Sequence, residues 1–256
     1  GLTGIGQSIA VPDIDARSGY VQQYSLDLQR QLPGGFVLSA GYIGSKSLNL
    51  AQDGRNINQL APEFLSLGST LNQAVANPMF GLGGVLGVGG ATITRSQSLR
   101  PFPQFTGISL DRSATNRAVY HSAYVKVQRR FSNGFTSLAT YTRSQNMDGS
   151  YGSVGNVFAA TVGGPQNAYA PEAEYSLSSS HSPHRFSLAT TYELPFGKGK
   201  AWLSSNRFLD LAAGGWSLNL VSVMQTGYPL TVTQPNDNSI LGANHMRPNA
   251  TGLSPL

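Results

Sequence analysis

Six segments of the sequence alternate apolar and polar side chains over about the length that a tilted strand needs to cross a lipid bilayer, roughly 9 to 11 residues. In the first segment, YVQQYSLDLQRQL, Leu26 and Leu28 alternate with Ser25 and Asp27. A period of two residues puts successive side chains on opposite faces of a strand. The pattern therefore predicts an all-β chain whose strands lie near residues 20–32, 36–45, 120–131, 135–144, 185–194 and 216–232.

The connections between these segments alternate between short and long. Short turns are expected at residues 33–35, at residues 132–134 and after the fifth strand, and the long loops are 46–119, 145–184 and 233–256. A β-sandwich has no reason to gather its short turns at one end, whereas an outer-membrane barrel has short periplasmic turns and long extracellular loops. The expected fold is an antiparallel up-and-down transmembrane β-barrel in the outer membrane. Aromatic residues at the strand ends are typical of its two interfacial girdles.

Composition supports a chain of this kind. Only 11% of the residues are charged, far below the roughly 25% of a typical soluble domain. The chain has no cysteine, so a disulfide framework and a thiolate metal site are both excluded. The net charge of +5 comes from scattered basic residues, and no basic stripe with interleaved aromatics predicts nucleic-acid binding. No apolar run is long enough for a transmembrane helix, and residues 1–20 do not read as a signal peptide.

Five stretches carry a resemblance to a known family. They are YVQQYSLDLQRQLPGGFVLSAGYIGSK, LRPFPQFTGIS, YHSAYVKVQRRFSNGFTSLATYTRSQNMD, PHRFSLATTYELPFGKGK and GGWSLNLVSVMQTGYPLTV. In this order, over about residues 17–235, they resemble the barrel of TonB-dependent outer-membrane receptors of the Oar-like kind. The resemblance implies energised uptake of a substrate, driven from the inner membrane through TonB.

Two parts of such a receptor have no counterpart in the sequence: the plug with its TonB-contacting segment, and the aromatic-ended final strand. Six strands are also too few to close a barrel, because the smallest have about eight and plugged transporters about 22. We therefore expect residues 1–256 to be part of a single barrel domain, an incomplete barrel. The plug and the contact with the TonB system are expected from the rest of the polypeptide, and the outer-membrane lipid surrounds the strands.

Motifs of enzyme chemistry fail on inspection. The run Gly197-Lys198-Gly199-Lys200 lacks the Gly and the Ser or Thr of a phosphate-binding loop, and it reads as a turn whose lysines reach water or lipid headgroups. His181 and His184 form H-x-x-H, but Pro183 breaks the helix that would aim both rings at one ion, so they are expected to anchor a loop. The sequence predicts no catalytic residue, no cofactor and no metal site.

Candidate ligand contacts lie on the polar strand face and in the loops. The polar face is expected to line the lumen, where water or a plug can solvate charges. A short helix is expected from Pro62, and two prolines extend the chain around residues 100–105, which either line a ligand surface or anchor the loop. Selectivity is expected from loops 47–117 and 146–183. The candidates are Asp27, Gln29, Lys126, Gln128, Arg130, Glu193 and Asn219 on the lumen side, and Arg100, Phe102 and Phe105 in the loop.

Two other functions stay open at this stage. A passive porin would share the barrel but would lack a plug. A secreted β-rich adhesin or polysaccharide-binding module would have to bury its apolar strand faces against a second sheet. The sequence names no substrate, so a carbohydrate, a peptide and a chelate remain equal candidates for the transported molecule.

Overall fold

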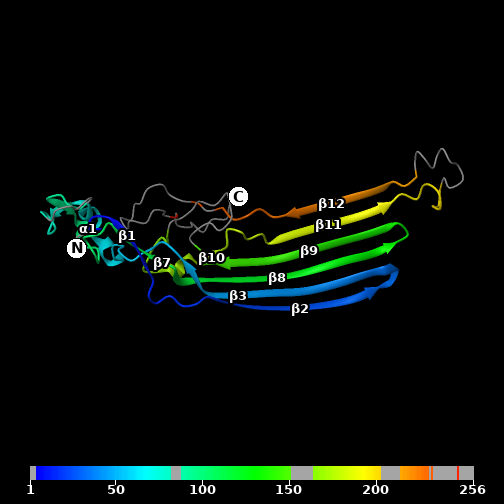
Figure 1. The fold of residues 1–256 in the computed structure, drawn as a ribbon, viewed down its shortest axis with the longest axis horizontal. Coiled ribbons are helices and arrows are strands. Elements are labelled where there is room, and N and C mark those ends of the chain that lie inside the picture. The colour runs from blue at the N-terminus through cyan, green and yellow to red at the C-terminus, as the bar shows by residue number, and fades with distance from the viewer. Residues whose placement is uncertain are drawn as a thin grey trace.

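The fold is dominated by one long antiparallel sheet (Figure 1). The computed structural model describes residues 4–81, 88–150, 164–202, 214–230, 232 and 247. Six long strands lie side by side in the order in which the chain forms them, so the sheet is an up-and-down meander with two open edges. The strands are β2 (Tyr20–Leu32), β3 (Phe36–Gln52), β8 (Ser113–Ser132), β9 (Phe135–Asp148), β11 (His184–Glu193) and β12 (Ser217–Gln225), and β10 (Ser176–Leu177) pairs with the end of β9.

The register gives the sheet two chemically different faces. We call the face that carries Asp27 and Tyr124 the inner face and the face that carries Leu26 and Val125 the outer face. One row of paired residues on the inner face crosses all six strands, and the neighbouring rows of the outer face are largely apolar. This inner row consists of Asp27, Gly41, Tyr124, Thr142, Arg185 and Gln225.

The strands differ from the predicted bounds mainly at the end that carries the long loops. β3 continues to Gln52, β8 begins at Ser113 and β9 continues to Asp148, so residues 46–52, 113–119 and 145–148 are strand and not loop. Beyond a bilayer both faces of a strand meet water, so apolar residues such as Leu48 stand among polar ones such as Lys46 and Asn49, and the period-two signal fades while the backbone ladder continues. β12 is shorter than predicted and ends at Gln225, before Gly227 and Pro229, which disfavour a strand.

At the opposite end, two of the three connections are tight. Pro33–Gly35 joins β2 to β3, and Gly34 and Gly35 both have a positive φ of 77°. Asn133 and Gly134 also have positive φ, as a two-residue hairpin of the mirror-image turn type requires. The third connection is not the short turn that the sequence predicted, because residues 194–216 separate β11 from β12. Its described part folds back on itself through a bridge between Phe196 and Trp202.

An aromatic cluster marks this turn end on the outer face. The guanidinium of Arg129 lies 5.3 Å from the ring centre of Phe36 and 5.1 Å from that of Phe135. Phe135 in turn packs edge-on against Tyr192. Rings that hold an arginine in this way suit a boundary between an apolar layer and water.

The long loops at the other end fold into a compact unit, which we call the loop module (residues 4–16 and 53–112). It contains a three-stranded sheet, a hairpin and two short helices. Leu60 and Leu71 are fully buried here, so the apolar core of the described chain lies in this module. Its elements are β1 (Ser8–Pro12), β4 (Arg55–Asn56), η2 (Pro62–Asn72), β5 (Ala74–Ala76), β6 (Thr92–Thr94), α1 (Arg95–Ser98) and β7 (Gly107–Asp111), and η3 (Pro171–Glu174) belongs to the next loop.

The helical turns are short. The helix predicted from Pro62 is a 3₁₀ helix, and Gly68 interrupts it with a non-helical conformation. In the parts of the chain that the structure describes, no helix has the length and apolar character to span a membrane.

Gly41 provides a first prediction. A Cβ added at Gly41 would lie 2.6 Å from the ring of Tyr124, which covers this glycine on the inner face. Gly41→Val in the full-length protein is therefore expected to displace the ring and to destabilise the barrel by about 1 to 3 kcal/mol. The measurement is the urea midpoint of folding. The mobility shift between unboiled and boiled samples reports the folded fraction.

The neighbouring outer-face residue gives the matched control, since Ala40→Val adds the same kind of volume where the side chain is exposed. Removing the ring should also relieve the clash, so Gly41→Val in a Tyr124→Ala background should cost much less. Equal costs in both backgrounds would show that the ring over Gly41 is not the cause.

Candidate functional site on the inner face

The inner face carries the polar residues that the sequence singled out. Asp27 accepts a hydrogen bond from the hydroxyl of Tyr124, whose ring reaches across Gly41 from two strands away. Gln29 and Lys126 lie in one row on either side of Ser39. The missing side chain of Gly41 thus makes room for a cross-strand contact that fixes the Asp27 carboxylate.

The remaining predicted residues lie nearer the turn end. Gln128 pairs with Val37, and Asn219 accepts a hydrogen bond of 2.8 Å from the hydroxyl of Thr191. Glu193 forms an ion pair of 2.7 Å with Lys200, which corrects the expectation that this lysine reaches only water or headgroups. Both partners are partly exposed, and such a pair contributes little to stability.

Arg130 falls where the ladder between β8 and β9 shifts register, so the pairing assigns it no partner there. The seven predicted residues therefore spread along the inner face from the middle of the sheet to its turn end. They share one wall but do not converge on one point.

A concavity of about 430 Å³ opens on the inner face nearer the loop end. Three tyrosines contribute rings with hydroxyl groups, and Arg185 contributes a cation. The neighbouring Gln225 side chain donates to the Tyr228 hydroxyl at 3.4 Å. The polar groups that matter most for binding are those of Tyr120, Tyr124, Asn146, Arg185, Gln225 and Tyr228.

The charge of this concavity is carried by Arg185. Arg185 lies in the same row as Asp27, four strands away, which corresponds to about 19 Å at the usual strand spacing. Among the described residues Arg185 has no ion-pair partner. Tyrosine rings beside an unpaired guanidinium suit a polar ligand with hydroxyl groups and an anionic group.

Neither Arg185 nor Tyr124 is among the predicted site residues, although the strand alternation in the sequence marks both positions. Arg185 directly precedes Phe186 on the apolar face, and Tyr124 lies between Ala123 and Val125, so the same alternation puts both on the polar face. The contact of Tyr124 with Asp27, in contrast, depends on the register between β2, β3 and β8.

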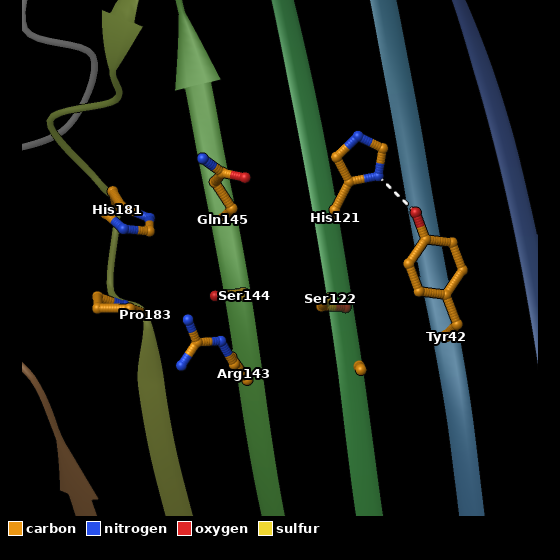
Figure 2. Close-up of a pocket in the computed structure, with 9 residues that line it drawn as sticks. Tyr42, His121, Ser122, Arg143, Ser144, Gln145, His181 and Pro183 are labelled. Atoms are coloured by element: carbon orange, nitrogen blue, oxygen red, sulfur yellow. Dashed lines mark hydrogen bonds between the residues drawn. The ribbon is translucent and has the colours of Figure 1, made fainter.

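A second concavity, of about 370 Å³, lies at the same height mainly among side chains of the outer face (Figure 2). Tyr42 and His121 come from neighbouring strands, and the Tyr42 hydroxyl lies 2.5 Å from His121 Nδ1. Their rings stack with centres 6.1 Å apart. Arg143 and Gln145 follow on β9, and His181 and Pro183 form the remaining side.

The two histidines of the H-x-x-H motif have separate partners. His181 is buried, and its Nδ1 accepts a hydrogen bond of 3.2 Å from the backbone N–H of Asn146. His184 Nδ1 lies 2.7 Å from the Tyr141 hydroxyl. Over the described ranges, no cluster of three His, Cys, Asp or Glu residues could hold a metal ion. Each ring instead connects residues 181–184 to β9.

The loop candidates lie within the loop module. The Arg100 guanidinium donates to the backbone carbonyl of Thr106, and burial lowers the pKa of this side chain. Phe102 is exposed and Phe105 is half-buried. The backbone of both phenylalanines is held by Asn58, which is fully buried. These contacts anchor the segment, and Phe102 is its exposed side chain.

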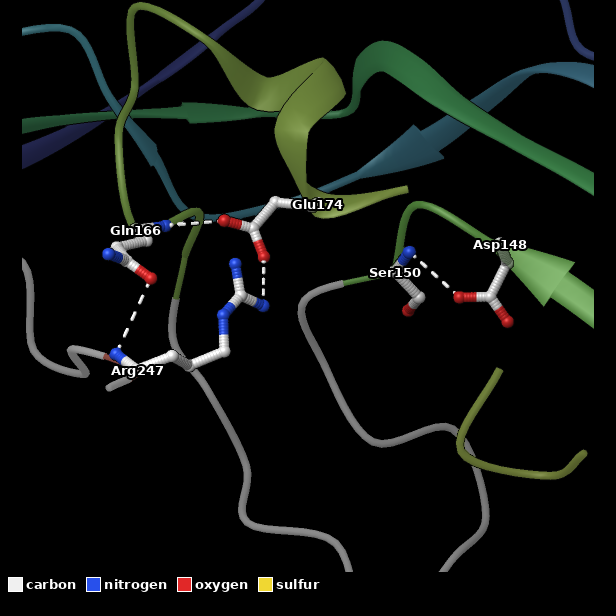
Figure 3. A network of polar contacts seen from close by, with 5 residues as sticks. All are labelled: Asp148, Ser150, Gln166, Glu174 and Arg247. Atoms are coloured by element: carbon white, nitrogen blue, oxygen red, sulfur yellow. Dashed lines mark hydrogen bonds and ion pairs between the residues drawn. The ribbon is translucent and has the colours of Figure 1, made fainter. Parts of the chain in front are cut away.

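A buried carboxylate organises the loop that follows β9 (Figure 3). Glu174 forms an ion pair of 2.6 Å with Arg247 and accepts a hydrogen bond of 2.9 Å from the backbone of Gln166. Nearby, the Asp148 carboxylate accepts from the backbone of Ser150 at 2.9 Å. The Glu174 side chain is 3% exposed and that of Arg247 is 40% exposed, so the carboxylate is the buried partner and Arg247 reaches it from the surface.

A meander sheet with one apolar exposed face and one polar face defines the wall of a membrane-spanning β-barrel. The comparison with protein families agrees, because the family described as outer membrane beta barrel domain matches residues 1–256. The chain therefore belongs to this family and is an outer-membrane protein. Neither curated proteins nor solved structures gave a match.

Proposed function

We propose that this chain is part of the barrel wall of a TonB-dependent outer-membrane receptor of the Oar-like kind, which takes up a substrate with energy passed through TonB. The family resemblance of five stretches in order supports this proposal. The barrel membership alone fits a passive porin equally well. The difference between the two functions lies in what fills the lumen: a folded plug in the receptor, and water in the porin.

An apolar patch on the inner face favours the plugged receptor. Leu138, Ala189 and Val221 form one row across β9, β11 and β12, and Val223 lies in the next row. Leu138 is 39% exposed, Val221 78% and Val223 53%. A water-filled lumen would leave this patch in contact with water, whereas a plug supplied by the rest of the polypeptide would bury it. This patch is the observation that carries the proposal.

The substrate would meet the inner-face concavity above this patch. Its tyrosines, amides and the unpaired Arg185 suit a polar molecule with hydroxyl groups and a negative charge. Carbohydrates, peptides and chelates each include such molecules. Within this proposal, Arg185 would receive the anionic group of the substrate.

Conductance separates the receptor from the porin. In planar bilayers the full-length protein is expected to show no steady current, because the plug closes the lumen. Val221→Asp introduces a carboxylate under the plug, where burying an unpaired charge is costly, so a channel should open at lower urea concentration than in the wild type. The measurement is the current recorded during a urea titration.

Asn219→Asp is the matched control, because it adds the same charge two residues away on the same strand and face, where a polar side chain already stands. It should open at the wild-type urea concentration. A steady ohmic current from the wild-type protein would make the porin the correct assignment.

A further inference from the structure

The outer-face concavity lies where the apolar outer surface ends on the long-loop side. On β8 the outer-face residues between Arg129 and His121 are Val127, Val125 and Ala123. Along a strand tilted by about 35–45°, eight residues rise about 19 to 22 Å. The apolar band of outer-membrane barrels is about 25 Å tall. His121 therefore lies close to the lipid–water boundary on the side of the extracellular loops.

Residues on the neighbouring strand β9 place the concavity at the same height in the membrane. Arg143 follows Phe135 by eight residues on the outer face of β9, and Phe135 belongs to the aromatic cluster at the turn end. Above the apolar band, Tyr42 stacks on Tyr24 and on His121. Stacked tyrosine and histidine rings at this level form the girdle that outer-membrane barrels present to lipid headgroups.

The concavity offers hydrogen-bond donors and contains no acidic residue among its described lining. Arg143 is exposed, and among the described residues it has no ion-pair partner. His181 Nδ1 accepts the Asn146 N–H, so in the neutral ring the proton is on Nε2. Together with the Gln145 amide, the site presents one fixed positive charge and several donors.

We propose that this concavity binds the phosphate group of a lipid headgroup in the outer leaflet. An unpaired arginine beside neutral donors matches a phosphate, which has several acceptor oxygens and a negative charge. The height of the site puts that phosphate at headgroup level, while the lipid chains lie along the apolar outer face below. The site is separate from the inner-face concavity and does not depend on the energised transport proposed above.

Lipid binding to the delipidated full-length protein in detergent tests this site, with native mass spectrometry as the measurement. The probes are monophosphoryl lipid A, the same lipid without its phosphate, and inorganic phosphate. Arg143→Gln should weaken binding of the phosphorylated lipid about tenfold, the usual scale for a charged hydrogen bond. Binding of the dephosphorylated lipid should not change, and Arg143→Lys should recover part of the loss.

Arg95→Gln is the control, because it removes the same charge from an exposed arginine of the loop module that lines neither concavity. It should leave lipid binding unchanged. The mobility shift on boiling shows that each variant has folded, and Gln145→Ala replaces Arg143→Gln if that variant does not fold.

Three results would overturn the proposal. The wild type binding both lipids equally would show that phosphate is not recognised. An equal loss in Arg143→Gln and Arg95→Gln would indicate a general charge effect. Displacement of the lipid by inorganic phosphate at equal concentration would indicate a site for free anions.

Discussion

Val125→Arg is expected to destabilise the assembled barrel by about 2 to 4 kcal/mol, the cost of a basic residue at the bilayer midplane. Val125 is on the outer face and 46% exposed, between Ala40 and Tyr141 on the neighbouring strands. It lies four residues from both Arg129 and His121, which bracket the apolar band. A guanidinium at this depth must either leave its water or thin the bilayer.

The inner face supplies the control for this change. Gln128→Arg adds the same side chain on the same strand, but toward the lumen, and should cost far less. Leu26→Arg should behave like Val125→Arg, since Leu26 also faces outward. The measurement is the urea midpoint of folding in lipid vesicles, and full tolerance of Val125→Arg and Leu26→Arg would mean that these faces meet water.

The sequence predicted the sheet because lipid imposes a simple rule. Outward positions between the girdles are largely apolar, so the strand period is visible around Val125 and Leu26 without any knowledge of pairing. The same rule does not apply beyond the bilayer, where both strand faces meet water, so Lys46 and Asn116 belong to paired strands without a clear period of two.

Contacts between distant residues could not be predicted from the period. The bond from Tyr124 to Asp27 requires three strands in one register and a glycine between them. In the sequence, Leu138 is a single apolar residue on the polar face of its strand. Only the pairing of β9, β11 and β12 shows that Leu138, Ala189 and Val221 form one apolar row on the inner face. The outer-face concavity likewise depends on the register of four segments.

The loop module was the least predictable part, because polar side chains hold it together. Asn58 is fully buried, and its Nδ2 donates to the carbonyls of Phe102 and Phe105 at 3.0 and 2.8 Å. Its Oδ1 accepts the Phe102 N–H at 2.9 Å. One amide thus satisfies three backbone groups of a segment more than 40 residues away, and nothing in the local sequence marks it.

Asn58→Ala is therefore expected to release the segment around residues 100–105 while the barrel stays folded. The Phe102 N–H loses its partner, and the carbonyls of Phe102 and Phe105 each lose one of two donors. An unpaired group costs about 1 to 3 kcal/mol if it stays buried. Opening the segment to water avoids that cost, so chymotrypsin should cut after Phe105 at least about tenfold faster than in the wild type. The measurement is limited proteolysis of the full-length protein in vesicles, with the mobility shift on boiling as the check on the barrel.

Two further variants separate the amide from a general effect of mutation. Asn58→Asp keeps the acceptor but turns an oxygen toward two carbonyl oxygens, so it should release the segment as Asn58→Ala does. Ser98→Ala removes an exposed hydroxyl contact in the same module and should stay within about 0.5 kcal/mol of the wild type. If Asn58→Ala left cleavage unchanged, the prolines and the Gln97 amide, which donates to the carbonyls of Pro103 and Phe105, would be enough to hold the segment. The Asn58 side chain contacts only backbone groups of the segment. If releasing the segment weakened substrate uptake, Phe102 would be identified as a ligand contact. If substrate uptake did not change, the segment would be a purely structural anchor.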